Sequence, residues 1–264
     1  DFEIKEGKGC IIKYDDNGNI LLEGEYLHTL NGKGKEYYYN GNLLFEGEYL
    51  YGKKWNGKGY NINGNIDYEI KEGKGNIKEY YDNGILKFEG EYINGQRNGK
   101  GKEYYKNGKL LYEGEFLNSK LIGKGKEYYY NGNLFFEGEY LYGKKWNGKG
   151  YNINGNIDFK IKEGKGYIKE YYNNDKLLYE GDYLNGYLNG KGKEYYDNGK
   201  LKYEGQYVND ERNGNGKEYN LDGLLIFEGE YSKRIRNEKE KEHNYLSKLK
   251  FLTENLNEER DEFD

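Results

Sequence analysis

Apolar and polar residues alternate along short stretches of this chain. In the stretch 88–92 two aromatic residues and a central glycine fall on one face of an extended strand, and two glutamates fall on the other. In the stretch 99–105 two lysines share a face opposite two glycines. A register that sets Gly90 opposite Gly101 pairs each of these glutamates with a lysine and lays Tyr92 over Gly99. The pattern therefore predicts antiparallel strands with one charged face and one aromatic face.

Turn residues separate these runs. Asn107-Gly108, Asn131-Gly132 and Asn198-Gly199 each lie between two strand-like stretches. Asn-Gly between such runs is typical of a type I′ hairpin turn, which needs positive φ at both central residues. We therefore expect a series of β-hairpins with type I′ turns at these positions.

The hairpin pattern is repeated along the chain. A Gly-x-Gly element opens ten units, and a second block of units lies 91 residues after the first, as Gly32 and Gly123 illustrate. The stretches 57–73 and 148–164 lack the Tyr-Tyr pair and the Glu-Gly-Glu segment, so we expect a shortened hairpin at each. Internal repeats of this length are typical of arrays in which each unit buries its apolar side against its neighbours. The predicted fold class is an elongated, single-layer, twisted antiparallel sheet of about ten hairpins over residues 1–231.

The repeated motif has a known counterpart. Tyr/Phe-Glu-Gly-Glu-Tyr, a polar turn and Asn-Gly-Lys-Gly follow one another over residues 2–231, and Tyr-Tyr-x-Asn-Gly precedes many copies. This pattern resembles the MORN repeat (membrane occupation and recognition nexus), including its Tyr-Tyr-x-Asn-Gly variant. Tyr or Phe stands where that family often has Trp. The resemblance implies a non-enzymatic scaffold, with cytoskeletal, membrane-proximal or self-associating roles.

The composition changes after residue 231. Glycine disappears, and Tyr245, Leu249, Leu252 and Leu256 form a stripe with helical spacing. We expect residues 232–264 to contain a helix with an acidic tail. That helix either caps the last hairpin, as repeat arrays require, or forms a short coiled coil that supports a homodimer or docks a partner.

Composition supports an array without a deep core. The chain has 41 Gly, 34 Tyr, no Pro and no Met, and 34% of its residues are hydrophobic. Its net charge is −5 with no long basic run, so nucleic acid is not an expected partner. The single cysteine, Cys10, allows no internal disulfide and fits a reducing, cytoplasmic setting. The missing initiator Met suggests a fragment or a processed chain.

No catalytic group stands out. His28 and His243 lie in different elements without metal-ligand spacing. The paired carboxylates, such as Glu46 and Glu48, recur with nearby lysines in nearly every unit, which indicates ion-pair ladders and not one acid–base pair. We therefore expect no enzymatic activity, no metal and no cofactor.

Two groups of residues are candidates for binding. One consists of two copies of a Lys-Lys-Trp loop, in which the Trp either packs over the following glycines or contacts an anionic lipid or acidic partner; its members are Lys53, Lys54, Trp55, Lys144, Lys145 and Trp146. The other is the row of ring-bearing strand positions, which is either structural or the wall of a groove. Its members are Phe45, Tyr49, Phe88, Tyr92, Tyr112, Phe116, Phe136, Tyr140, Tyr179, Tyr183, Tyr203, Tyr207, Phe227 and Tyr231.

Three function hypotheses follow. The first is a scaffold whose aromatic groove takes a protein segment, such as a helix or a cytoskeletal component. The second is a module that binds anionic phospholipid through the Lys-Lys-Trp loops. The third is an antitoxin-like or ligand-binding repeat region of a larger protein. The first is the leading hypothesis.

Overall fold

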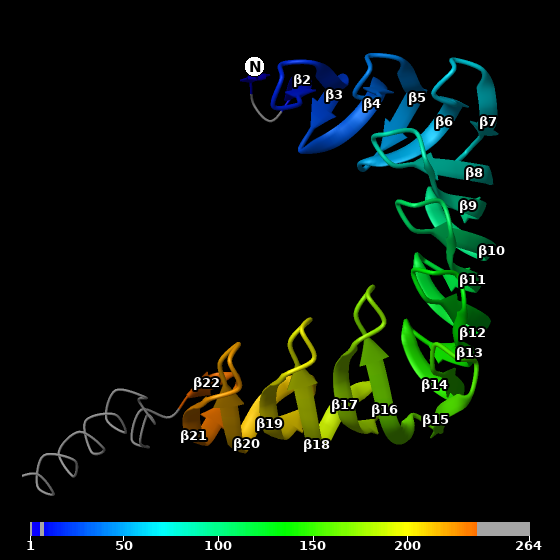
Figure 1. Cartoon of the computed structure of the whole chain (residues 1–264). Coiled ribbons are helices and arrows are strands. Elements are labelled where there is room, and N and C mark those ends of the chain that lie inside the picture. Colours follow the sequence, from blue (N-terminus) through cyan, green and yellow to red (C-terminus); the bar gives the residue numbers. More distant parts are fainter. Residues whose placement is uncertain (1, 6–7, 237–264) are drawn as a thin grey trace, which may run out of the picture. The chain divides into compact units, whose positions relative to one another are not determined.

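The computed structural model describes residues 2–5 and 8–236 and shows β-strands joined by tight turns (Figure 1). The chain divides into two compact units, Asp1–Gly143 and Lys144–Asp264. All strand pairs within each unit are antiparallel and follow chain order. The predicted all-β array of hairpins is confirmed.

Unit 1 holds a seven-stranded sheet, β1 to β7, followed by the strands β8 to β13 of a second sheet. Their bounds are β1 Phe2–Lys5, β2 Lys8–Tyr14, β3 Ile20–Leu27, β4 Thr29–Tyr37, β5 Leu43–Leu50, β6 Lys53–Tyr60, β7 Ile66–Ile70, β8 Gly75–Tyr80, β9 Leu86–Ile93, β10 Gln96–Tyr104, β11 Leu110–Leu117, β12 Lys120–Tyr128 and β13 Leu134–Leu141.

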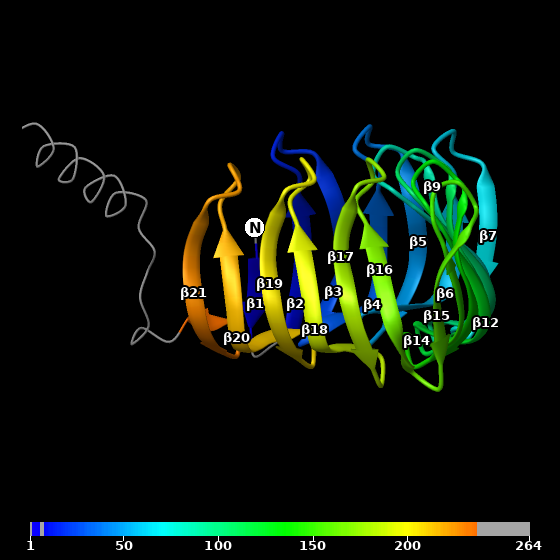
Figure 2. The same ribbon diagram turned by 60° about the horizontal axis from the view of Figure 1, so that its bottom comes forward.

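Unit 2 continues the same pattern, and Figure 2 shows its strands β16 to β21 as neighbouring arrows with a turn at each end. Their bounds are β14 Lys144–Tyr151, β15 Ile157–Lys162, β16 Lys165–Tyr171, β17 Leu177–Leu184, β18 Tyr187–Tyr195, β19 Leu201–Val208, β20 Glu211–Tyr219, β21 Leu225–Ser232 and β22 Ile235–Arg236. Strand pairing thus extends to Arg236. The predicted C-terminal helix and its stripe from Tyr245 to Leu256 lie outside the described residues.

The turn types differ from the sequence prediction. At Asn107-Gly108 only the glycine has positive φ (80°), and the Gly108 N–H donates to the Tyr105 carbonyl. This is a type I turn followed by a glycine bulge, not the type I′ turn that we predicted. Two-residue turns with positive φ at both positions occur instead at the opposite edge of the hairpins, as at Asn94-Gly95 (53° and 66°).

The predicted glycine register is confirmed, but the predicted aromatic contact is not. Gly90 lies opposite Gly101, and Glu89 lies opposite Lys102. The register then shifts, so that Tyr92 lies opposite Arg97 instead of Gly99. Gly99 has φ of 90°, and the Glu91 side chain occupies the space beside it. A bulge, which sequence alternation does not reveal, causes this difference.

Aromatic rings lie flat against the glycines and form the core of each unit. A Cβ atom on Gly125 would come within 2.6 Å of Cζ of Tyr112, and Tyr112 is only 1% exposed. Successive rings meet edge to face: the centroids of Phe88 and Phe116 are 5.3 Å apart, and those of Tyr112 and Tyr140 are 5.4 Å apart. Glycine is therefore needed here because a ring occupies the place of its side chain.

Tyrosine hydroxyls tie one hairpin to the next. The Tyr105 hydroxyl donates to the carbonyl of Tyr128 at 2.8 Å, and Tyr172 donates to Tyr195 at the same distance. Burial raises the pKa of Tyr105 to about 12, so its hydroxyl is neutral and able to donate at physiological pH. Each bond joins residues 23 positions apart and so ties one hairpin to the next, as in repeat arrays whose units are stabilised by their neighbours.

Candidate functional site

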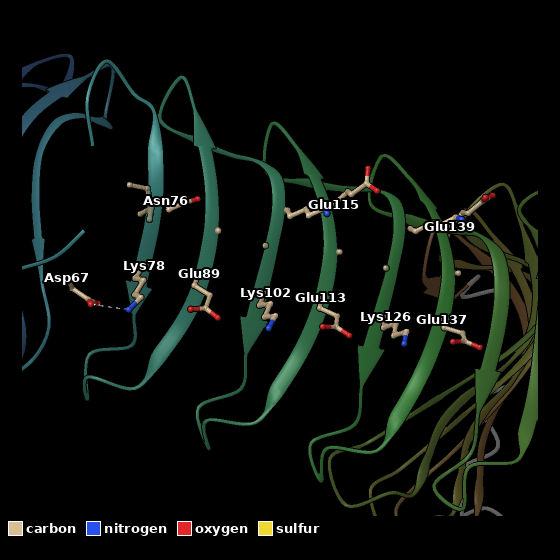
Figure 3. Close-up of a pocket in the computed structure, with 18 residues that line it drawn as sticks. Asp67, Asn76, Lys78, Glu89, Lys102, Glu113, Glu115, Lys126, Glu137 and Glu139 are labelled. Atoms are coloured by element: carbon tan, nitrogen blue, oxygen red, sulfur yellow. Dashed lines mark hydrogen bonds and ion pairs between the residues drawn. The ribbon is translucent and has the colours of Figure 1, made fainter. Parts of the chain in front are cut away.

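A groove crosses the charged face of unit 1 (Figure 3). It has a volume of about 890 Å³ and is lined by residues from β7 to β13. We call it groove 1. Its floor is a row of paired glycines that runs across the strands, namely Gly90, Gly101, Gly114, Gly125 and Gly138. A side chain at any of these glycine positions would point to the face that the rings fill. The charged face therefore presents bare backbone between its two rows of charges.

Two rows of charges flank the glycine floor. In one row, Figure 3 shows Lys78, Glu89, Lys102, Glu113, Lys126 and Glu137 in strand order. The other row contains Asn76, Lys100, Glu115, Lys124 and Glu139. Lysine and glutamate alternate from strand to strand, so each row repeats its charge every second strand.

The carboxylates of groove 1 are held by donors of the protein itself. The Tyr104 hydroxyl donates to Glu89 and the Tyr128 hydroxyl donates to Glu113, each at 2.6 Å. Glu91, which follows the groove-lining Gly90 on β9, accepts from the backbone N–H of Lys100 at 3.2 Å. Burial raises the pKa of Tyr104, and the bond to Glu89 raises it further, so the hydroxyl remains a donor.

The lysines of the central strands are not held in this way. Lys100 and Lys102 on β10, and Lys124 and Lys126 on β12, line the groove and are exposed. Within residues 8–236 their ammonium groups make no hydrogen bond or ion pair. At these positions the predicted lysine and glutamate partners lie opposite each other in the strand register but form no ion pair. Groove 1 offers four cations to a ligand, while Glu89 and Glu113 are hydrogen-bonded to tyrosines of the protein itself.

An apolar row borders groove 1 at the ends of three strands. Ile93, Leu117 and Leu141 are 39%, 39% and 38% exposed and end β9, β11 and β13. Strand alternation places each on the same face as the glutamates of its strand. The charged groove thus has an apolar rim with one residue per hairpin.

Unit 2 carries a related but smaller groove of about 570 Å³, which we call groove 2. Here Gln206 and Asn215 occupy positions that hold Glu and Lys in groove 1. Lys217 Nζ lies 3.2 Å from Glu228 Oε1, and Lys193 Nζ lies 4.0 Å from Glu204 Oε2. A third groove of about 610 Å³ crosses β2 to β5 in unit 1.

Comparison with protein families accounts for this repeating face. A model of the MORN repeat variant matches residues 30–51, 74–94, 165–185 and 188–209. A model of the MORN repeat matches residues 88–109, 112–134 and 203–224. Together the matches cover more than half of the chain. The chain belongs to the MORN-repeat family. MORN repeats form a non-enzymatic repeat module that mediates protein and lipid interactions.

Similarity to individual proteins is weak. No curated protein matches the chain. A TcdB2-TccC3 structure without its hypervariable C-terminal region is 11% identical, with a TM-score of 0.20, and the match covers 87% of this chain but 14% of that one. Virginiamycin B lyase from Staphylococcus aureus is 12% identical, with a TM-score of 0.21, and 85% of this chain and 84% of that one are covered. The MORN chain thus spans about one seventh of the first structure it matches.

The first Lys-Lys-Trp segment of the MORN array lies on β6 and is built into the fold. Lys54 Nζ is 2.8 Å from Glu36 Oε2 and 4.6 Å from the centroid of the Phe45 ring. Burial lowers the pKa of Lys54, but Glu36 outweighs this effect and raises it. The Trp55 ring lies against Gly73 in the next turn, whereas the atoms nearest to Gly57 in its own strand belong to Glu46, Phe45 and Gly47. Lys53 lies beside Gly95.

The second copy lies at the start of β14. Lys144 Nζ is 4.0 Å from the centroid of the Tyr187 ring and 3.5 Å from Asp210. The Lys145 carbonyl accepts from the Tyr183 hydroxyl at 3.3 Å, and Trp146 lies against Gly164. Each loop presents a tyrosine at its tip instead, since Tyr51 and Tyr142 are 76% and 66% exposed.

The predicted aromatic positions of the MORN array lie in its core. All of them are buried except Tyr92, which is half-buried. The aromatic side is therefore not an open groove, because the rings lie on glycine and cations cover them: the Arg97 guanidinium lies 4.1 Å from the Phe88 ring centroid. Of the two roles predicted for these positions, burial supports the structural one, and groove 1 lies on the opposite, charged face. The side chains missing at the glycine row would point toward the rings, so it is strand alternation that leaves bare backbone between the two charged rows.

Beyond the groove, the described residues show neither a metal-ligand cluster nor a spanning helix. No group of three His, Cys, Asp or Glu side chains in this part of the chain could hold a metal ion. The same part of the chain contains no helix that is long and apolar enough to cross a membrane.

Proposed function

We propose that the MORN array is a protein-interaction scaffold, and that groove 1 is its binding surface for an acidic amphipathic helix of a partner. The observation that carries this proposal is the set of four unpaired lysines around a bare glycine floor. A partner helix supplies the carboxylates that the array itself does not supply to these lysines.

The spacing of groove 1 favours a helix over an extended peptide. Neighbouring strands are about 4.8 Å apart, so each feature of the groove recurs about every 9.6 Å, once per hairpin. A helix presents the same face every seven residues, or about 10.5 Å. An extended peptide presents the same face about every 6.7 Å, which does not match. One helical heptad therefore corresponds to one hairpin over β8 to β13.

The sign of the charges and the apolar rim define the partner helix further. The partner helix is expected to place one apolar side chain per heptad against the apolar row of Ile93, Leu117 and Leu141. The lysine strands β10 and β12 lie midway between these residues, so a carboxylate three or four positions after each apolar residue would reach them. The expected partner has a Leu-x-x-Glu-Glu type of heptad.

A designed peptide tests this proposal. Its three heptads carry Leu and Glu at the positions named above, and a scrambled peptide of the same composition serves as the control ligand. Titration of the full chain, followed by fluorescence anisotropy, is expected to show binding of the heptad peptide that weakens with added salt. The quadruple variant Lys100→Gln, Lys102→Gln, Lys124→Gln, Lys126→Gln is expected to lose binding at least tenfold.

A matched variant controls for net charge. Lys71, Lys74, Lys106 and Lys109 do not line groove 1, and their replacement by Gln removes the same total charge. This variant is expected to bind like the wild type. Equal binding of both peptides, or equal losses in both quadruple variants, would contradict the proposal. Binding of phosphatidylserine vesicles with no binding of either peptide would favour the lipid hypothesis instead.

A further inference from the structure

The strands β7 and β8 diverge directly after their turn. They are joined by one pair of residues, Lys71 and Lys74, which exchange two backbone hydrogen bonds of 2.9 Å. The hairpin of β9 and β10, by contrast, keeps several pairs along its length. The ladder of backbone hydrogen bonds is thus interrupted within unit 1, and a cavity of about 300 Å³ lies at this interruption.

The cavity has apolar walls supplied by residues that belong to the core. Tyr49, Ile70 and Ile77 are 4%, 3% and 2% exposed, and they line the cavity together with Leu44 and Tyr92. At about 30 Å³ for a water-sized group, the cavity holds a ligand of about ten non-hydrogen atoms. Such a concave apolar site with a few polar groups is typical of small-molecule sites.

The acids of the cavity are each paired with a cation of the fold. Glu36 accepts from the Tyr49 hydroxyl at 2.7 Å and pairs with Lys54 at 2.8 Å. Glu79 accepts from Tyr92 and pairs with both Nε and Nη2 of Arg97, at 2.8 and 2.7 Å. The negative charge of each carboxylate is therefore compensated by a cation of the fold.

Cations at the cavity are in excess. Lys78 also lines it and pairs with Asp67 at 3.0 Å. Lys53 and Lys87 line it as well, and within the described residues neither ammonium group makes a hydrogen bond or an ion pair. Lys87 Nζ lies 5.8 Å from the centroid of the Tyr81 ring, a weak cation–π contact that leaves its positive charge in place. Two available cations thus border an apolar chamber.

We propose that this cavity is a binding site for a small amphipathic carboxylate, with its aryl or short acyl body between Ile70 and Ile77 and its carboxylate on Lys53 and Lys87. The cavity adjoins groove 1, with which it shares Ile77 and Lys78. The proposal uses none of the four lysines on β10 and β12 and does not depend on the helix proposal. The acids are already paired with Lys54 and Arg97, which disfavours a cationic ligand, and the apolar walls disfavour a fully hydrated anion such as inorganic phosphate.

Ligand-observed NMR on the full chain tests the proposal with four probes: phenylacetate, octanoate, phenylacetamide and inorganic phosphate. The two carboxylates are expected to bind, and the uncharged amide and the phosphate are expected to bind at least tenfold more weakly. The pair Lys53→Gln, Lys87→Gln is expected to weaken carboxylate binding about tenfold, since two exposed ion pairs are lost. Leu44→Trp, which fills the chamber, is expected to abolish it.

The matched control is Lys71→Gln, Lys74→Gln, which removes two positive charges from the neighbouring turn between β7 and β8 without touching the cavity lining. It is expected to bind both carboxylates like the wild type, with the circular-dichroism spectrum confirming that all variants are folded. The proposal is overturned if neither carboxylate binds the wild type. It is equally overturned if binding survives both Leu44→Trp and the Lys53, Lys87 pair, because the ligand then lies elsewhere.

Discussion

Grooves 1 and 2 have floors of the same kind but differ in whether their lysines are paired with glutamates. In both, paired glycines form the floor, as Gly114 with Gly125 and Gly205 with Gly216 show. In groove 1 the lysines of β10 and β12 are unpaired, whereas in groove 2 Lys193 and Lys217 lie within 4.0 Å of a glutamate. Two charged positions of groove 2 are also replaced by amides.

This difference separates what the fold requires from what a ligand requires. Glycines and rings are the same in both units because a ring can lie on the strand only where no side chain intervenes. The exposed charges contribute little to stability, since exposed ion pairs are worth about 0 to 1 kcal/mol. They are therefore free to differ, and we infer that groove 1 is the more specialised of the two.

The largest expected effect comes from the glycine floor. Gly125→Val would drive its side chain into the Tyr112 ring, and Gly192→Val would drive it into Tyr179, whose Cζ a Cβ would approach to 2.8 Å. Overpacking of this kind should cost about 3 kcal/mol of unfolding free energy in either unit. Urea denaturation measures this cost, with the exposed neighbour Lys126→Val as the control. A loss below 1 kcal/mol in one unit only would show that the two floors are not equivalent.

The next effect concerns the arginines that cover the rings. Arg97 lies on Phe88 and pairs with Glu79 at 2.7 Å, and Arg212 lies on Tyr203 at 4.1 Å and pairs with Glu194 at 2.7 Å. Replacing either arginine by leucine leaves a half-buried carboxylate without its partner. We expect a loss of about 2 kcal/mol at pH 7 in each unit. A lysine at either position should recover part of the loss, because it keeps the charge but not the paired geometry.

The same pairs make stability depend on pH. Burial would raise the pKa of Glu79 and of Glu194, but the hydrogen bonds from Arg97 and Arg212 lower both below the usual value. A lowered pKa in the folded state contributes stability above the unfolded pKa of about 4.3, and this contribution is lost as the pH falls. The difference between wild type and the arginine variants should therefore shrink between pH 7 and pH 3. A difference that stayed constant in urea denaturation at both pH values would count against this assignment.

A smaller effect is expected from the bonds between hairpins. Tyr105→Phe in unit 1 and Tyr172→Phe in unit 2 each remove one hydroxyl that donates to a backbone carbonyl. Loss of one such bond should lower the unfolding free energy by about 1 kcal/mol. Tyr130→Phe is a suitable control, since Tyr130 is an exposed aromatic residue. Equal stability of Tyr105→Phe and the wild type would mean that ring packing alone couples the hairpins.

More of the fold than of the candidate site could be predicted from the sequence. Alternation and glycine spacing predicted the hairpins and the pairing of Gly90 with Gly101, because a period of two fixes which residues share a face. The bulge that moves Tyr92 away from Gly99, and the type I turn at Asn107, depend on backbone detail that alternation does not encode. The pairing of Lys54 with Glu36 is tertiary and equally hidden. The two roles predicted for the aromatic positions, structural or groove wall, could not be told apart because a ring that packs on its own sheet and a ring that lines a groove follow the same alternation.

The smallest effect on stability, and the sharpest comparison of function, comes from exchanging the charges. Gln206→Glu with Asn215→Lys gives groove 2 the charge pattern of groove 1, while Glu115→Gln with Lys124→Asn gives groove 1 the amides of groove 2. Neither pair should change the unfolding free energy by more than about 0.5 kcal/mol, because all four positions lie on the surface. Binding of the acidic heptad peptide should weaken in the second pair, which removes one of the four free lysines. The first pair should gain little, because Lys193 and Lys217 remain near glutamates in groove 2. If the first pair bound the peptide as tightly as groove 1 does, the charge pattern alone, and not the unpaired state of the lysines, would define the binding surface.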